Sequence, residues 1–157
     1  MEKPWLEALG KMTYGIYVLT AASGETINGM IASWVSQVSY SPPLIMVAVH
    51  PNRLTHGLIQ KSRAFALHVL ASHQKEYLSR FKGPDPQAKF SSLSWEKGIT
   101  GSPILKDCLA FLECQLRHTY SPGNHTLFIG EIVQGKALSH DPVLSTLDYS
   151  GTYLGKE

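Results

Sequence analysis

Hydrophobic residues recur along this chain in patterns that predict more strands than helices. Alternation with polar residues, or a short continuous apolar run, predicts six strands, at residues 14–22, 27–38, 44–49, 64–71, 109–120 and 126–138. Apolar residues three and four apart predict short helices at residues 4–12 and 74–81, and another that begins in the polar turn at 52–56. Strands at hairpin spacing that do not alternate regularly with helices favour an antiparallel barrel or sandwich.

Turn-forming residues set the boundaries of these elements. Ser23-Gly24-Glu25 predicts a hairpin between the first two strands, and the segment 121–124 predicts one between the last two. Ser41-Pro42-Pro43 lacks two backbone donors in succession, which marks a sharp connection and excludes a central strand there. Asn52 or Thr55 would cap the helix that follows. Residues 82–94 are polar and predict a loop whose length usually has a functional reason.

The composition changes this picture little but excludes several functions. The 157 residues are 43% hydrophobic and 17% charged, as expected for a single globular domain that spans residues 1–157. Fourteen Lys and Arg against twelve Asp and Glu, without basic runs, argue against nucleic acid as a partner. The apolar runs are far shorter than the ~20 residues that span a bilayer, and no signal-peptide core follows the first residues. We therefore expect a cytoplasmic protein without a membrane partner.

The two cysteines are expected to be buried and unpaired. Cys108 and Cys114 lie six residues apart in the strand-like run DCLAFLECQLR, and if that run is extended, at ~3.3 Å per residue, their Cα atoms lie ~20 Å apart. A disulfide needs Cα atoms no more than ~7 Å apart. Even spacing places both cysteines on one face with Ala110, Leu112 and Leu116, which favours small apolar core residues.

Several familiar site motifs are absent from the sequence. It has no GxGxxG turn between a strand and a helix, no GxxxxGK[ST] loop, no CxxC pair and no GxSxG elbow. A nicotinamide cofactor, if used, is therefore not held by a Rossmann turn. The seven histidines are scattered without a tight ligand spacing, which argues against a structural metal.

Three segments could carry chemistry, and the residues alone leave each one open. The turn at 52–56 either gathers amides, a hydroxyl and the Arg53 guanidinium for a phosphate, or is an ordinary capped helix start with a surface arginine. The strand from Gly29 to Ser36 either offers amides and small side chains to a flat heterocycle, or is a barrel strand at a tight bend. His125 is either a proton donor at a barrel mouth or a surface residue of a turn.

Taken together, these segments resemble the flavin reductase-like family with the FMN-binding split barrel. The resemblance runs from Met12 to the tail that contains Tyr153, Gly155 and Lys156. It is carried by NGMIASWVSQVSYSPPLIMVAV, the turn at 52–56, Arg80-Phe81 and GNHTLFIGEI, in that order. IASWVSQ and SPILKDCLAFLEC are also similar to the flavin reductase-like modules of flavodiiron proteins. The implied fold is mainly β, an antiparallel Greek-key split barrel with short peripheral helices.

The resemblance also implies which residues hold the cofactor. The family's strand along the isoalloxazine ring falls on Met30, Ile31, Ala32, Ser33 and Trp34. The ribityl and phosphate groups of FMN fall on Ser39, Asn52, Arg53, Leu54, Thr55 and His56, with Arg53 and Thr55 favoured for the phosphate. Arg80 is implied as a second cationic contact. His125 matches the histidine of the family's G-[DNT]-H-x-L-F-I-G-E motif, close to the ring, and is the residue expected to act in catalysis.

The activity implied by the resemblance is that of an FMN-dependent oxidoreductase. A hydride would pass from NADH or NADPH to flavin N5, and electrons would then pass to a flavin, a ferric complex or a protein. Two other functions stay open: an electron carrier with bound FMN that is served by a redox partner protein, and a small-ligand-binding barrel with no redox role. Members of this family are usually homodimers with flavin near the interface, and we expect the same here.

Overall fold

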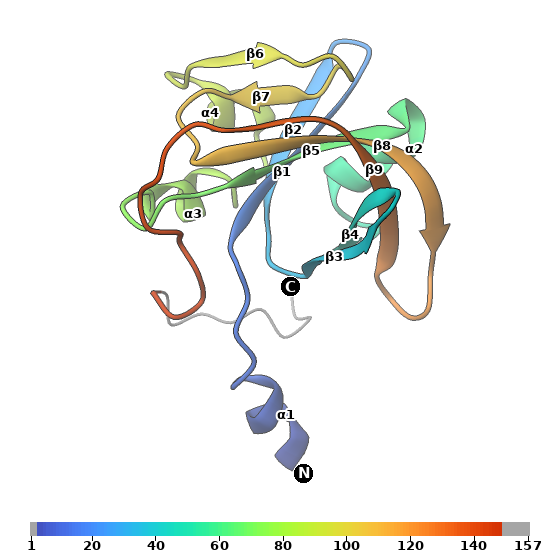
Figure 1. The fold of residues 1–157 in the computed structure, drawn as a ribbon, viewed down its shortest axis with the longest axis vertical. Helices are drawn as coiled ribbons and strands as arrows, with labels where there is room; N and C mark the ends of the chain where they lie inside the picture. The colour runs from blue at the N-terminus through green and yellow to red at the C-terminus, as the bar shows by residue number, and fades with distance from the viewer. Residues whose placement is uncertain (1–2, 149–157) are drawn as a thin grey trace.

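Strands β2 (Thr26–Ala32) and β3 (Val35–Tyr40) occupy opposite edges of one seven-stranded antiparallel sheet, although only Ser33 and Trp34 separate them in sequence. The computed structural model, which describes residues 3–148, orders the strands β2-β1-β5-β8-β9-β4-β3 (Figure 1). A two-residue link is too short to cross a flat sheet of this width, because neighbouring strands lie ~4.8 Å apart. The sheet therefore curls into a barrel whose two edge strands, β2 and β3, are joined by this link.

The remaining elements are short or complete this sheet. Its other strands are β1 (Tyr17–Ser23), β4 (Pro43–Val49), β5 (Ala64–Val69), β8 (Ala110–Tyr120) and β9 (Thr126–Ala137). A separate small sheet pairs β6 (Trp95–Lys97) with β7 (Pro103–Leu105). The helices are α1 (Pro4–Leu9), which stands away from the barrel in Figure 1, α2 (Leu54–Ser62), α3 (Glu76–Arg80) and α4 (Pro86–Phe90). The predicted fold, a mainly β antiparallel barrel with short helices, is confirmed.

One hydrophobic cluster fills the barrel. Leu19 of β1, Phe65 of β5 and Phe128 of β9 are fully buried in it. Leu58 and Ile59 of α2 belong to the same cluster, so α2 packs its apolar side into the barrel. The residues that precede and open α2, at 52–56, are thereby fixed at the barrel's mouth.

A second hydrophobic cluster lies where α3 and α4 cover the outside of β2, and Gly29 makes room for it. A Cβ at position 29 would lie 2.8 Å from Cε1 of Phe81, so the ring needs a glycine there. Phe81 is fully buried and meets Phe90 edge-on, with ring centroids 5.8 Å apart. The small size of Gly29 thus serves the packing of Phe81, which corrects the interpretation that it makes room for a heterocycle.

The single strand predicted at residues 27–38 is wrong, because the chain forms two strands there. β2 pairs with β1, whereas β3 pairs with β4 at the other edge of the sheet. The corner falls at Ser33-Trp34, and extended chain with a similar mixture of residues lies on both sides of it. The alternation of apolar and polar residues therefore does not reveal that the chain changes its pairing partner from β1 to β4 at this corner.

The predicted loop at residues 82–94 contains a helix, and the β6–β7 hairpin was also missed. Asp85 caps α4 by accepting a hydrogen bond from the Gln87 amide at 3.0 Å, and Pro86 lies in its first turn. These two residues are a helix-start signal, but five residues are too few to display a helical repeat. The predicted caps of α2 are wrong as well, since the N-cap is Arg53 and no side chain bonds there.

Both cysteines are buried and unpaired, as predicted. Burial raises the pKa of Cys108 to about 11 and that of Cys114 to about 12, so neither forms a reactive thiolate near neutral pH. The register of the pairing between β8 and β9 shifts between Glu113 and Cys114, and both of these consecutive residues are buried. The regular alternation assumed for this strand therefore breaks at that point.

The two predicted hairpins are confirmed, since β1 pairs with β2 and β8 with β9. Among residues 3–148 no helix is both long enough and apolar enough to cross a membrane. Tyr153, Gly155 and Lys156, at the end of the family resemblance, lie outside the described residues.

Candidate functional site

Two histidines from separate strands meet at one end of the barrel. Antiparallel pairing sets Val49 of β4 opposite Thr126 of β9, which brings His50 and His125 together as the next pair. Their rings meet edge to face, with centroids 5.2 Å apart and planes at 88°. The Trp34 ring lies against His125 as well, with centroids 4.8 Å apart. The β2–β3 link and the start of β9 therefore form one aromatic corner.

Hydrogen bonds determine whether Nδ1 of each of these histidines carries a hydrogen. Nδ1 of His125 donates to the Asn124 side-chain carbonyl at 2.8 Å, so the proton that His125 gains or loses belongs to Nε2. Nδ1 of His50 accepts the Asn52 backbone N–H at 3.2 Å, so this nitrogen carries no hydrogen. His125 is buried, with 7% of its surface exposed.

A third histidine lies beneath this corner, at the start of α2. Nε2 of His56 lies 2.8 Å from the Thr126 hydroxyl. Burial, and the neighbouring His50, lower the pKa of His56. His56 is thus a neutral, buried support for the first residue of β9, and its predicted contact with ribityl or phosphate stays a prediction.

Lys89 of α4 is a buried cation beside the same helix start. Only 4% of its surface is exposed, and its ammonium donates to the Asn28 side-chain oxygen at 3.0 Å and to the Gly29 carbonyl at 2.8 Å. Asn28 in turn donates through Nδ2 to the Thr55 hydroxyl at 3.0 Å. A chain of buried polar groups therefore runs from α4 through β2 to α2.

This polar chain carries uncompensated positive charge. Burial, together with the nearby Arg53, lowers the pKa of Lys89 to about 8. Among residues 3–148 no carboxylate forms an ion pair with Lys89 or Arg53. A buried cation normally has a charged partner, so two adjacent cations without one are suited to an anionic ligand. A phosphate fits this donor set, because it accepts several hydrogen bonds and carries close to two negative charges.

The structure brings many of the predicted site residues to this end of the barrel. Ser33 and Trp34 form the β2–β3 link, and Arg53 is half-buried at the start of α2. Thr55 is fully buried and already bonded to Asn28, so its hydroxyl lies behind the helix start. The others are placed as follows: Met30 and Ala32 buried in β2, Ile31 half-buried beside them, Ser39 half-buried in β3, and Asn52 and Leu54 exposed at the turn.

Arg80 makes a contact of a different kind. Its guanidinium Nη1 donates to the Ser91 carbonyl at 2.9 Å. Ser91 directly follows α4, so this bond ties the end of α3 to the end of the helix that carries Lys89. The arrangement makes Arg80 a support for α4.

Lys89 and Asn28 were missed by sequence reasoning. Lys89 fell in the predicted loop, where a lone lysine among polar residues looks like a solvated one. The available signal was the helix start at Asp85-Pro86, since a helix from there places Phe90 and its neighbour Lys89 on the barrel side. For Asn28, the available signal was a polar side chain in a strand that is otherwise largely apolar. A polar side chain that is buried in such a strand needs a hydrogen-bond partner.

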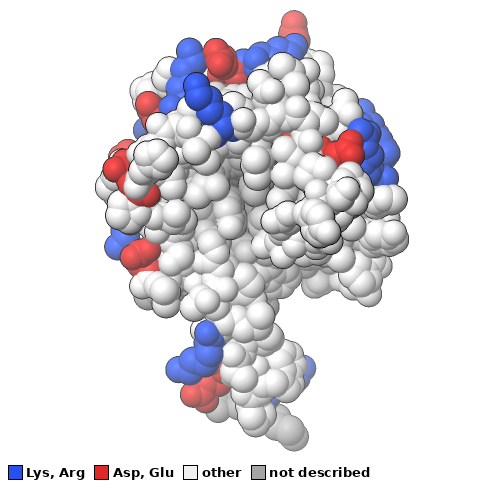
Figure 2. Space-filling model, in the orientation of Figure 1, with Lys and Arg blue, Asp and Glu red and all other residues white. Residues whose placement is uncertain are grey.

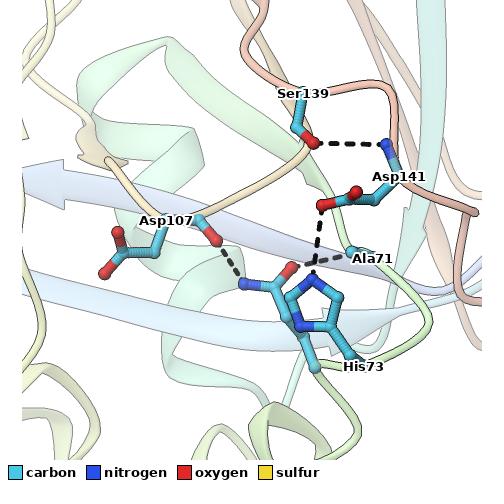
Figure 3. Close-up of polar contacts among 6 residues, drawn as sticks. Ala71, His73, Asp107, Ser139 and Asp141 are labelled. Atoms are coloured by element: carbon cyan, nitrogen blue, oxygen red, sulfur yellow. Dashed lines mark hydrogen bonds and ion pairs between the residues drawn. The ribbon is translucent and has the colours of Figure 1, made fainter.

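A separate group of polar contacts lies at the other end of β9, beside a cavity of about 400 Å³ (Figure 3). His73 pairs with Asp141 at 3.5 Å, and the Asp141 amide donates to Ser139 Oγ at 3.2 Å. Gln74 donates to the Asp107 carbonyl and accepts from the Ala71 amide. The His73–Asp141 contact fastens the segment after β9 to the loop after β5, as do the Ser72–Pro142 and Leu144–Leu70 backbone bonds, whereas Gln74 ties that loop to the turn before β8. They explain how that segment is held.

Known proteins are similar in sequence to this chain over most of its length. It is 35% identical over 135 residues to the diflavin flavoprotein A 1 of Synechocystis, covering 83% of this chain and 23% of that protein. It is also 35% identical over 136 residues to the high molecular weight rubredoxin of Moorella thermoacetica, covering 84% of this chain and 59% of that protein. The chain thus spans about a quarter of the first relative and somewhat over half of the second.

Solved structures share the fold. The NADH:FAD oxidoreductase of Streptomyces globisporus, in complex with NAD and FAD fragments, aligns with a TM-score of 0.81 and 27% identity, over 88% of this chain and 83% of that one. The FMN-binding protein of Thermus thermophilus aligns with a TM-score of 0.74 and 28% identity, over 81% of this chain and 72% of that one.

The family model described as "Flavin reductase like domain" matches residues 9–155, which is nearly the entire chain. The match includes β2, the start of α2, α4 and the His125 segment, so it covers both the aromatic corner and the cationic chain of the site. By this match the chain belongs to the flavin reductase-like domain family, whose members include flavin-dependent oxidoreductases.

Proposed function

We propose that this protein binds FMN and passes electrons from NADH or NADPH through the flavin to a downstream acceptor. The observation that carries the proposal is the pair of cations, Lys89 and Arg53, next to the aromatic corner of Trp34 and His125. A ligand with a phosphate at one end and an aromatic ring at the other matches both. The bound flavin would supply the redox chemistry, accepting a hydride and releasing electrons.

Each part of the site has a separate task in this proposal. Arg53, half-buried at the helix start, contacts the phosphate, and Lys89 lies behind it as a second positive charge. Ser39 and the turn at 52–56 hold the ribityl chain. Residues 30–34 lie along the ring and exclude water from one side of it.

His125 is the proposed catalytic residue. Because Asn124 holds its Nδ1–H, only Nε2 can exchange a proton with a ligand. A histidine in this state can donate a hydrogen bond from Nε2 when protonated and accept one when neutral. Such a group at a ring edge would stabilise the negative charge that reduction brings.

A carrier of electrons between proteins is the second candidate function. It is favoured by the similarity to a high molecular weight rubredoxin, of which this chain covers 59%. In that case a redox partner protein, and no nicotinamide, would reduce the bound flavin.

A homodimer is proposed as well. Figure 2 shows a broad face on which charged side chains gather only at the edges. The edge strand β3 exposes Val38 by 50% and Tyr40 by 87%, and an exposed apolar edge is a surface that proteins usually cover. Sedimentation at several concentrations tests the dimer. The single-domain organisation over residues 1–157 and the cytoplasmic location stay predictions.

Anaerobic reduction of the purified, FMN-loaded protein tests the function. Bleaching of the flavin absorbance by NADH or NADPH in a stopped-flow instrument is the expected result, and His125→Ala should keep FMN but slow the bleaching. Bleaching by a reduced electron-transfer protein alone would favour the carrier. A protein that takes up no flavin would refute both.

A further inference from the structure

The residue opposite His125 across the sheet is itself a histidine, His50, whose Nδ1 accepts a hydrogen bond. His50 follows the last residue of β4, and pairing of Val49 with Thr126 sets its backbone opposite that of His125. The two rings meet at 88° with centroids 5.2 Å apart. An edge-to-face contact of this kind holds both rings in one relative orientation.

The hydrogen bond from the Asn52 amide ties the His50 ring to the turn that leads into α2. Nδ1 of His50 accepts this bond at 3.2 Å, while Nδ1 of His125 donates to the Asn124 side chain at 2.8 Å. Each ring of the pair is therefore anchored by a hydrogen bond of its own as well as by contact with the other ring.

We infer that His50 is a positioning residue for His125, one that orients the His125 ring by edge-to-face contact. The turn itself does not require an aromatic ring at position 50, because an asparagine side chain could also accept the N–H of the residue two positions later. The contact with His125 does require a ring. His50 acts through His125 and makes no proposed contact with the ring of the cofactor.

Among residues 3–148, groups from four segments lie around this pair. Trp34 of the β2–β3 link and Asn124 before β9 contact His125, while Asn52 of the turn contacts His50. His56 of α2 is the third titratable group, and its pKa is lowered by burial and then by His50.

Two variants separate the ring contact from the hydrogen bond to the turn. His50→Phe keeps an aromatic edge beside His125 but cannot accept the Asn52 amide. His50→Asn keeps an acceptor for that amide but removes the ring. If His50 acts by positioning, the phenylalanine variant preserves the behaviour of His125, measured with FMN saturating where FMN is present, and the asparagine variant does not.

The first readout is NMR of the flavin-free protein with ¹⁵N-labelled histidine. In the wild type and in His50→Phe, the His125 nitrogens should show a single Nδ1–H tautomer when neutral. In His50→Asn they should show a mixture of tautomers and an altered titration. Unchanged ¹⁵N shifts and an unchanged titration of His125 in His50→Asn would overturn the inference.

The second readout rests on the proposed function. His50→Asn should slow flavin reduction about tenfold, with FMN affinity unchanged within about twofold, and His50→Phe should restore most of the rate. Equal rates in the wild type and His50→Asn would also overturn the inference. If the wild type is not reduced by nicotinamides at all, the proposed function fails while the NMR result still decides the role of His50.

Discussion

Lys89 and Asn28, which are 61 residues apart in sequence, are joined by a buried hydrogen bond of 3.0 Å from the ammonium to the amide oxygen. The bond fastens α4 to β2, and the Thr55 hydroxyl extends it to α2. Three elements that no local sequence pattern connects thus meet around one cation. That cation is also the charge that the proposed phosphate would meet.

Lys89→Met should weaken both FMN binding and the fold. Loss of a charged donor costs about 1.5–3 kcal/mol of binding free energy, or roughly 10- to 100-fold in Kd. The apo protein should unfold at a lower temperature, because the buried Asn28 oxygen and Gly29 carbonyl lose the donor that Lys89 provides. FMN titration by flavin fluorescence and thermal unfolding measure the two effects. Lys61→Met, at the exposed end of α2, is the matched control and should change neither.

Arg53→Ala should weaken FMN binding by roughly 1 to 3 kcal/mol, the range for loss of a charge-assisted hydrogen bond. The same substitution removes a neighbouring positive charge and should therefore raise the pKa of Lys89 in the apo protein. Isothermal titration calorimetry measures the first effect and NMR of ¹⁵N-labelled lysine the second. An unchanged FMN affinity would show that the phosphate lies elsewhere.

The affinity for FMN should fall as the pH rises above about 8. The pKa of Lys89 is lowered to about 8 in the free protein by burial and by Arg53. A bound phosphate would stabilise the ammonium and raise this pKa, so the complex holds a proton that the free protein has lost. Below about pH 6 the phosphate itself takes up a proton, which sets the other limit. Titrations across this range test the profile, and Lys89→Met should flatten its alkaline side.

His68 should make the fold sensitive to acid. It is fully buried, and burial lowers its pKa to about 4, while its Nδ1 donates to the Val18 carbonyl at 3.0 Å and its Nε2 accepts the Leu105 amide at 3.1 Å. The unfolded chain binds this proton near pH 6.5, so stability falls as the pH drops from about 6.5 to about 4, by up to roughly 3 kcal/mol. Urea unfolding at several pH values measures the slope. His118→Gln, on the exposed end of β8, should leave it unchanged.

Gly29→Ala and Gly57→Ala should have opposite effects on stability. The new Cβ at position 29 would press on the Phe81 ring at 2.8 Å and cost about 1–3 kcal/mol, as overpacking does. At position 57, inside α2, it would meet nothing within 4 Å and should gain about 0.5–1 kcal/mol from helix propensity. Chemical unfolding of the two variants compares them directly. Equal destabilisation by both would contradict the packing described for Phe81.

The strands of the large sheet were predictable from sequence because all seven have at least six residues, enough to display alternation or a continuous apolar run. The exchange of partners at Ser33-Trp34 was not, because the covalent chain stays extended while its hydrogen-bonding partner changes from β1 to β4. α4 was missed because five residues complete little more than one helical turn. Short elements take their stability from tertiary packing, and single-sequence patterns do not report it.

The candidate site divides in the same way. Arg53 and His125 lie in segments whose residue types suggest chemistry, so sequence and resemblance pointed to them. Lys89 and Asn28 become notable only when folding removes them from water and pairs the lysine with no carboxylate of residues 3–148. Gly29 was singled out for the right reason, its size, but the group that needs the space is Phe81.

The two-residue link between β2 and β3 fixes more than the closure of the barrel. Most surface connections tolerate insertions and deletions, but a residue added between Ala32 and Val35 would shift β3 by one position along β4 and turn every one of its side chains to the opposite face. Trp34 would move away from His125 in the same step. The number of residues in this link is therefore coupled to the geometry of the aromatic corner. Insertions and deletions are expected at the other loops of the barrel.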